Sequence, residues 1–433
     1  MQHQQKHSQS MIHNRDRSLQ FLNSDVQDLA LARIYPRRSR SRLRPVYRLI
    51  AWSLSMYPCS NFVEGDVNLL SYYETRLARI ITTVDDAQNG FRNEILPMAL
   101  TRQSAAASGL MEALLAVSAL HLGGYETALK HKTRAIQFLH RSLSSLESSD
   151  LSTSLAASML LCVYGVFDAV NSDWMVHLRG ARGLLKQQTK TGIPDDVVTP
   201  FMRTWVLYHD VLADFAQQGH DPGVEDDQTT HLPPWSHDKT IVVGSLGCSE
   251  ELMQLVSCIN KLCDQCAVED ELISELEKRL YGLSQNIEVR VEKPNVSSNH
   301  GVDEPRIRRT AEFYHLAALI YFNRQIRRYP TDSPIVQSLV LTALGLVSEM
   351  EVCTSPWPMF VVACEVLNDD QRLQVLEVLT KMESRRRMGN ISVTKIIVES
   401  LWKQQDLGLG EDGRAKLEWR DIADMRDLSP SFI

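Results

Sequence analysis

Two adjacent carboxylates are the first candidates for chemistry in this sequence. Asp85 and Asp86, followed by Asn89, would suit magnesium ions bound to the diphosphate of an isoprenoid substrate, since magnesium prefers oxygen ligands. An all-helical enzyme of that kind needs a second metal motif of Asn or Asp, Asp, Ser or Thr, and Glu. The nearest sequence, residues 368–377, lacks the hydroxyl. The sequence therefore favours a solvated loop and a charged helix start over a metal site.

Three cysteines could ligate an iron–sulfur cluster or zinc. Cys258, Cys263 and Cys266 have the spacing Cys-x4-Cys-x2-Cys, which is similar to that of plant-type clusters. A cluster-binding segment wraps around its metal, whereas this one has apolar residues at helical spacing, so buried structural thiols are favoured. Only one Cys-x2-Cys pair occurs, and six short-spaced thiolates for a Zn2Cys6 cluster are missing. We expect neither a metal nor a cofactor.

Other enzyme signatures are also missing. The sequence has no G-x-S-x-G elbow, Walker loop, H-E-x-x-H motif or G-x-G-x-x-G motif after a strand. The thirteen histidines do not cluster at metal spacing. His177, beside the apolar face of its helix, is typical of a buried hydrogen-bonding side chain. The sequence predicts a protein that is not an enzyme and has no catalytic residues.

Residues 1–60 differ from the rest of the chain, because they are polar at first and then rich in arginine. Five of these arginines lie close together: Arg37, Arg38, Arg40, Arg42 and Arg44. Pro36 and Pro45 interrupt any helix, so we predict a disordered basic arm. It suits a nuclear import signal, a phosphate-contacting tail or a plain linker. A mitochondrial transit segment is less favoured, because the preceding residues include aspartates.

The overall charge argues against a broad nucleic-acid surface. The chain has 433 residues and a formal net charge of −7, whereas phosphate contacts need cations. Its composition, 44% hydrophobic and 23% charged, is that of a globular protein with a sizeable core. No apolar signal segment opens the sequence, and the apolar run 155–170 is shorter than the roughly 20 residues of a membrane helix. We expect a soluble intracellular protein.

Helical periodicity dominates from about residue 69 to 401 and predicts an all-α fold. Residues 109–122 are apolar nearly all round and 125–146 are amphipathic, so we expect an antiparallel hairpin that turns at Gly123 and Gly124. The fold is predicted to be a multi-helix array of such hairpins. Since no fixed repeat length occurs, a regular short-period solenoid is not expected. The helical body is placed at 61–433.

Loops and helix ends follow from composition. Residues 219–247 and 288–304 are predicted to be exposed loops, because they are rich in polar residues, Gly and Pro. A helix over 369–385 is expected to end in arginines that suit its dipole. Gly389 is expected to stop this helix, and Asn390 to cap the next one.

Aromatic residues on these helices could line a pocket for a small molecule. Trp174, Trp205, Tyr208 and Trp357 are the candidates, although core packing is the favoured interpretation.

Segments in a consistent order resemble the fungal-specific transcription factor domain family. The family-like segments include residues 69–73, 93–99, 114–122, 128–139, 177–181, 244–252, 357–365, 369–372, 387–390, 398–402 and 419–421. The resemblance covers about residues 66–425. It implies a nuclear regulator of transcription, often of a metabolic or secondary-metabolite pathway. Five signature residues are expected to be structural: His177, Gly180, Trp357, Pro358 and Trp402.

The sequence departs from this family before its helical part. Members usually begin with a Zn2Cys6 cluster, whereas residues 1–60 offer only the basic arm. Either the regulator has no cluster of its own, or an upstream exon is missing from the sequence. Direct DNA contact would need the arm or such a cluster.

Three functions follow from these observations. The favoured one is a fungal-type transcription regulator that works with the transcription machinery or other regulators, as a homo- or heterodimer, with an unknown small-molecule effector and no membrane. The second is an interaction module without DNA binding that partners a full-length regulator. The least favoured is a terpene-synthase-like enzyme, suggested by Asp85 and Asp86.

Overall fold

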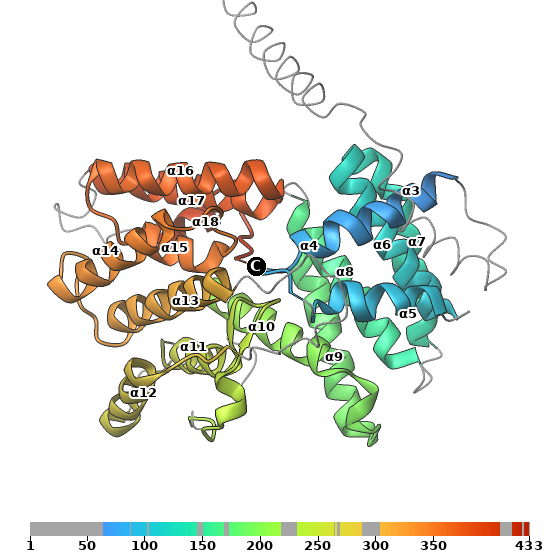
Figure 1. The fold of residues 1–433 in the computed structure, drawn as a ribbon, viewed down its shortest axis with the longest axis horizontal. Coiled ribbons are helices and arrows are strands. Elements are labelled where there is room, and N and C mark those ends of the chain that lie inside the picture. Colours follow the sequence, from blue (N-terminus) through green and yellow to red (C-terminus); the bar gives the residue numbers. More distant parts are fainter. Residues whose placement is uncertain are drawn as a thin grey trace, which may run out of the picture. The chain divides into compact units, whose positions relative to one another are not determined.

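A computed structural model describes residues 64–432, apart from residues 87, 102–103, 145–149, 169–172, 218–231, 264, 266–268, 288–303, 408–417 and 427. The predicted basic arm and Cys266 lie outside these residues. The all-α prediction is confirmed, since the described residues are mostly helical and contain only two two-residue strands (Figure 1).

The helices follow the periodicity of the sequence closely. Their bounds are α3 Glu64–Tyr72, α4 Ala78–Ile80, α5 Leu96–Thr101, α6 Ala105–Gly123, α7 Tyr125–Ser144, α8 Leu151–Phe167, α9 Trp174–Thr191, α10 Pro200–Gln217, α11 Glu250–Cys263, α12 Asp270–Gly282, α13 Glu304–Gln325, α14 Pro334–Ser348, α15 Pro356–Cys364, α16 Asp369–Arg386, α17 Gly389–Asp406 and α18 Trp419–Met425. Two π-helical turns, η1 Tyr73–Leu77 and η2 Phe91–Ile95, and two 3-10 turns, η4 Asp195–Val197 and η5 His237–Thr240, complete the helical elements. The strands are β1 Val242–Val243 and β2 Cys248–Ser249.

The predicted hairpin is confirmed, although Gly123 is the last residue of α6 and only Gly124 lies between the two helices. Helices α6 and α7 pack against each other, and Gly124 joins them with φ of 81°, a left-handed conformation that glycine adopts without strain. Helix α6 also packs on α8, every residue of which is buried. By length and composition α6 could cross a membrane, contrary to the sequence expectation, but 61% of its apolar window is buried inside the protein. A buried core helix has the same composition.

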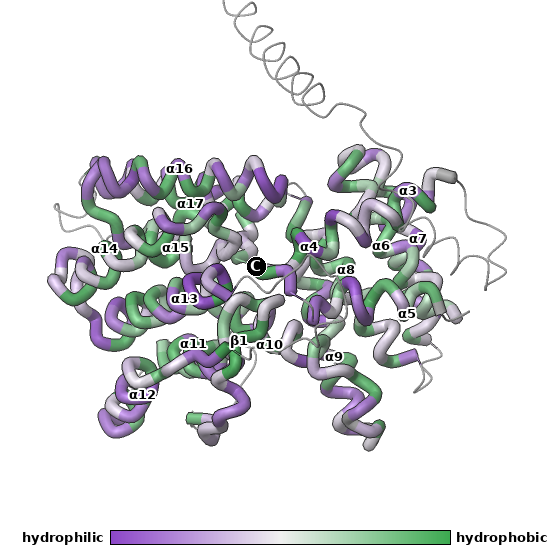
Figure 2. The backbone as a smooth tube through the Cα atoms, viewed as in Figure 1, coloured by the Kyte–Doolittle hydropathy of each residue, from purple (hydrophilic) through white to green (hydrophobic). Residues whose placement is uncertain are grey.

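The C-terminal helices build a second set of packed pairs. Helix α13 packs on α14 and α15, and α15 packs on α17. Figure 2 shows α16 alternating between hydrophilic and hydrophobic segments along its length, and its buried side includes Val375, Leu379 and Met382. An amphipathic helix of this kind buries one face and leaves the other to solvent.

The predicted junction after α16 is wrong in detail. Arg387 has φ of 51° and ends the helix, whereas Gly389 is the first residue of α17 and Asn390 is buried within it. Arg386 is only 5% exposed and donates to the backbone oxygens of Ile80, Thr82 and Thr354. These contacts come from segments far away in the sequence, so the arginine ties elements together and does not simply face the helix dipole.

Part of the segment 219–247 is not an exposed loop. Residues 219–231 are outside the described part, but Thr240 and Leu246 are buried, and β1 pairs antiparallel with β2. The Val84 amide donates to the Gly244 oxygen at 2.9 Å, which holds the turn between the strands. A composition rich in Gly and Thr cannot reveal such long-range pairing. Of 288–304, only Glu304 is described, and it begins α13.

Candidate functional site

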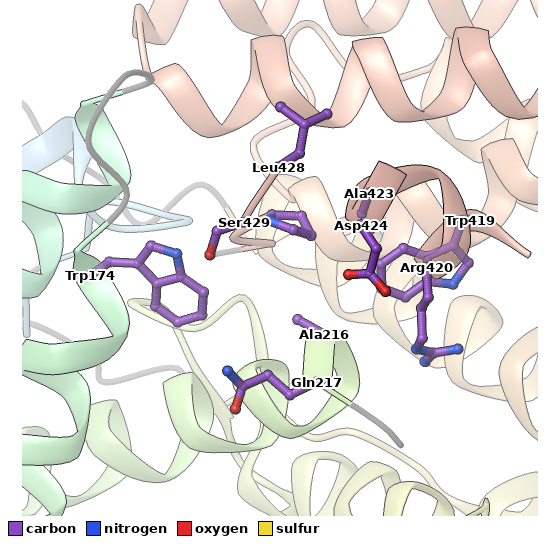
Figure 3. A pocket seen from close by; sticks show the side chains of 10 residues that line it. Trp174, Ala216, Gln217, Trp419, Arg420, Ala423, Asp424, Leu428 and Ser429 are labelled. Atoms are coloured by element: carbon purple, nitrogen blue, oxygen red, sulfur yellow. The ribbon is translucent and has the colours of Figure 1, made fainter. Parts of the chain in front are cut away.

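A cavity of about 140 Å3 lies where α9 begins, α10 ends and α18 packs. Figure 3 shows its side chains arranged around a common space, with Trp174 on one side and Trp419 and Arg420 on the other. The lining residues are Trp174, Ala216, Gln217, Trp419, Arg420, Ala423, Asp424, Leu428, Ser429 and Pro430. Residues more than 240 positions apart in the sequence therefore line the same cavity.

The position of Trp174 is fixed by the residues around the start of α9. The preceding Asp173 accepts a hydrogen bond of 2.8 Å from Nζ of Lys132 on α7, and its carboxylate lies 3.9 Å from Nε2 of His177. Gly165 of α8 makes room for Trp174, because a Cβ at that glycine would lie 2.7 Å from the Trp174 backbone nitrogen. The indole is thus held in place by α7, α8 and its own helix.

Trp174 carries an unusual polar atom. The residue is 2% exposed, and its Nε1 is buried with no hydrogen-bond partner among the described residues. Leaving a buried donor unsatisfied costs about 1–3 kcal/mol, so such groups are rare in folded proteins. Because Trp174 lines the cavity, a molecule inside it could supply the missing acceptor.

Arg420 forms the opposite side of the cavity. Its guanidinium donates to the Phe215 backbone oxygen at 2.9 Å and lies 4.4 Å from the centre of the Trp419 ring. Glu418 is 3.7 Å away and provides a carboxylate. The side chain of Arg420 is 12% exposed, so it is a preorganised, partly desolvated cation.

An aromatic cluster holds α18 and the residues after it. Trp419 stacks on Phe215 with 5.4 Å between the ring centres, and the ring centres of Phe360 and Phe432 are 4.3 Å apart. Phe432 is fully buried. The Leu428 amide donates to the Ala423 oxygen at 2.9 Å, so residues 428–430 fold back as a wall of the cavity. Aromatic burial of this size stabilises the wall strongly.

The lining supports binding better than catalysis. It combines aromatic and aliphatic surface with a few polar groups, which is typical of small-molecule sites, and no histidine or cysteine lines it. Within the described residues no group of three His, Cys, Asp or Glu side chains could hold a metal ion.

The candidate magnesium site has another structural use. Asp85 lies 3.6 Å from Arg79 and 3.7 Å from Arg92, and it accepts a hydrogen bond from Asn89. Asp86 accepts from the Gln88 amide at 2.9 Å, and burial raises the pKa of its carboxyl. The two carboxylates therefore bind their own loop and neighbouring arginines.

The candidate cluster cysteines lie on or after α11. Cys258 is 6% exposed and Cys263 is half-buried, with its sulfur 3.9 Å from the Tyr321 hydroxyl. Burial raises the pKa of the Cys258 thiol, and it raises that of Cys353 to about 11. Such thiols stay protonated at neutral pH and are poor nucleophiles and ligands. Cys266 is outside the described residues.

The signature residues occupy packed positions. Trp357 and Pro358 are buried in α15, and the Trp402 indole donates to the Ala363 oxygen at 2.9 Å. Gly180 faces α8, where a Cβ would lie 3.9 Å from Ser158 Oγ. Burial lowers the pKa of His177, although the nearby Asp173 opposes this effect. Of these five residues, only His177 lies near the cavity, because its ring is close to the carboxylate of Asp173, the residue before Trp174.

The sequence indicates only part of this site. Of the four aromatic candidates, Trp174 lines the cavity, while Trp205, Tyr208 and Trp357 are buried in the core. Gln217, Arg420 and Ser429 were not singled out as site residues. The family-like segment 419–421 was the available signal, but its neighbours in space could not be known.

A second cavity of about 400 Å3 lies beside α12. One wall is Trp235, which is 62% exposed, and another is Arg279, which binds Glu251 and the Pro233 oxygen. Arg279 and the buried Glu251 neutralise each other, while the exposed Glu275 and Lys278 also line this cavity. The two tryptophans that line the smaller cavity, Trp174 and Trp419, are both buried, so we regard the smaller cavity as the better candidate site.

Comparisons with known proteins match nearly the whole helical part. The family model described as fungal specific transcription factor domain matches residues 68–433. The chain is 23% identical to "Transcription factor iacI" of Pestalotiopsis fici over 381 residues, covering 85% of this chain and 93% of that protein. It is 20% identical to "Transcriptional activator protein UGA3" of Saccharomyces cerevisiae over 410 residues, covering 80% of this chain and 74% of that protein. No solved structure gives a significant match.

Proposed function

Because the chain belongs to the fungal specific transcription factor domain family, we propose that this transcription regulator acts in the nucleus and controls a metabolic or secondary-metabolite gene set. The observation that carries the proposal is the family match over residues 68–433. That match extends over almost all of the described helices, including those that build the Trp174 cavity. The helical body then serves as the regulatory part and has no catalytic role.

The basic arm is the proposed link to the nucleus or to DNA. Its arginines, Arg37, Arg38, Arg40, Arg42 and Arg44, lie outside the described residues and concentrate positive charge in a chain of net charge −7. Clustered arginines suit either an import receptor or DNA phosphates. Partners of the helical body are proposed to be other regulators or the transcription machinery.

A localisation experiment combined with transcript profiling tests the proposal. The full chain fused to a fluorescent protein should accumulate in the nucleus, and deletion of the gene should change a limited set of transcripts. Changing the five arginines to glutamine should reduce nuclear accumulation, if the arm is the import signal. A cytosolic protein whose deletion leaves all transcripts unchanged would contradict the proposed function.

The second candidate is an interaction module that partners a full-length regulator without contacting DNA. The net negative charge favours it. Gel-shift measurements with the full chain separate the two, because binding through the arm must weaken steeply with salt, by about 0.9 log unit per log unit of salt for each phosphate contact. No DNA binding at low salt, together with co-purification of another transcription factor, would support the module.

A further inference from the structure

The cavity at α9 contains a buried donor that the described protein groups leave unsatisfied. Trp174 is 2% exposed, and its Nε1 has no partner among these residues. An indole N–H only donates, so the missing partner must be an acceptor. Figure 3 shows the indole directed into the space that Gln217 and Ser429 also border. An occupant of the cavity must therefore place a hydrogen-bond acceptor next to Nε1 of Trp174.

The volume suits a small occupant. The cavity measures about 140 Å3, close to the roughly 150 Å3 of an engineered apolar cavity that binds benzene. Pockets for drug-sized ligands are larger, at about 300–1,000 Å3. A single six-membered ring with one small substituent fits this space. Ala216, Ala423 and Leu428 give such a ring apolar surface to contact.

The charges around the cavity favour a neutral occupant. Arg420 supplies one cation, but Glu418 lies 3.7 Å from it, and Asp424 also lines the cavity. The lining carries one guanidinium and one carboxylate, and a second carboxylate lies beside the guanidinium, so the site has no excess positive charge to attract an anion. A carboxylate would also lose its hydration on entering this partly buried space. A neutral carbonyl oxygen can accept from Trp174 without that penalty.

We propose that this cavity binds a small neutral ring compound whose carbonyl oxygen accepts a hydrogen bond from the Trp174 indole. The apolar body of the compound lies against Ala216, Ala423 and Leu428, while Arg420 closes the opposite side. Binding itself is independent of the proposed function. The further step, that the compound acts as an effector of transcription, rests on that proposed function.

Titration of the full chain with three probes tests the proposal. The tryptophan indoles are labelled with 15N, and the Trp174 signal is identified as the one that Trp174→Phe removes. Cyclohexanone should shift this signal saturably. Methylenecyclohexane has the same shape without an acceptor and benzoate carries a charge, and both should bind about 5- to 10-fold more weakly, the usual effect of one hydrogen bond.

Two further variants act as controls. Trp357→Phe removes an equally buried indole with an unpartnered Nε1 outside the cavity and should leave cyclohexanone binding unchanged. Ala423→Leu fills the cavity, keeps the indole and should abolish the shift. No saturable shift, a shift that survives Ala423→Leu, or tighter binding of benzoate would overturn the proposal. Binding with unchanged transcripts in a deletion strain would leave the site intact and refute the proposed function instead.

Discussion

Trp174 and Trp357 are a matched pair in two different regions. Both are at most 2% exposed, and neither Nε1 has a partner among the described residues. Trp357 stacks on Tyr314 at 6.0 Å and meets Phe215 and Tyr321 edge-on, in the interior of the aromatic cluster. Trp174 instead borders a cavity of about 140 Å3.

An indole N–H without a hydrogen-bond partner therefore has a different cause in each of the two regions. In the aromatic cluster the packing of large rings outweighs the lost hydrogen bond, because each buried ring contributes several kcal/mol. Beside the cavity the packing is incomplete and there is room for an acceptor. The same atom type is therefore a cost of packing in one region and a recognition element in the other.

The largest expected effect is on stability, in the aromatic cluster. Trp357→Ala should lower the free energy of unfolding by about 3–5 kcal/mol, because a fully packed ring is lost and a cavity is left. Trp174→Ala should cost less, since its surroundings are already partly open. Urea denaturation of both variants measures the two losses. Equal losses would mean that the two tryptophans are packed alike.

Gly165 on α8 tests how tightly the start of α9 is packed around Trp174. Gly165→Ala should lower stability by about 1–3 kcal/mol, the usual cost of overpacking, because the new Cβ would lie 2.7 Å from the Trp174 backbone. Gly180→Ala is the matched control in the neighbouring helix, where the nearest atom is 3.9 Å away, and it should be tolerated. Thermal unfolding measures the loss of stability in both variants. A tolerated Gly165→Ala would show that Trp174 can move.

The core around α10 should also respond to pH. Burial lowers the pKa of His209 to about 3, so the histidine stays neutral in the folded protein, while the unfolded chain takes up a proton below about pH 6.5. Stability is therefore lost as pH falls from about 6.5 toward 3. Between pH 7 and 5 the loss from His209 alone should be about 2 kcal/mol.

Urea denaturation at the two pH values measures this loss. His209→Gln should reduce the difference between pH 7 and pH 5, whereas His140→Gln, on the exposed side of α7, should keep it. An unchanged pH dependence in His209→Gln would mean that the histidine takes up its proton in the folded state as well.

The smallest effect concerns ligand-induced stability. At a cyclohexanone concentration about ten times the dissociation constant, the wild-type chain should gain about 1.4 kcal/mol. Trp357→Phe should gain as much, whereas Trp174→Phe should gain about 1 kcal/mol less, because its affinity is lower. Thermal shift measurements with and without cyclohexanone compare the three chains. Equal gains in all three would place the compound elsewhere.

The sequence predicted local structure well and tertiary contacts poorly. An amphipathic helix was expected over 125–146, and α7 is found at Tyr125–Ser144, because apolar periodicity within the segment indicates such a helix. The end of α16 was predicted to within one residue, but Gly389 and Asn390 belong to α17, and Arg386 is buried by carbonyl groups from residues 80–82 and 354. Periodicity contains no information about such partners.

The cavity shows the same limit. Trp174 was named among four aromatic candidates, but nothing in the sequence distinguished it from Trp357. Arg420 becomes a cavity residue only because Phe215 and Trp419 stack and bring α10 and α18 together. That contact joins positions more than 200 residues apart, so only the folded chain reveals it.

In the proposed mechanism, this transcription regulator responds to a small molecule through the cavity beside Trp174. Transcript profiles of strains with Trp174→Phe, Trp357→Phe and a complete deletion test this response. We predict that Trp174→Phe changes expression within the same gene set as the deletion, while Trp357→Phe, at equal protein level, matches the wild type. A deletion strain with a wild-type transcript profile, or identical profiles for the two tryptophan variants, would contradict a regulatory role for this cavity.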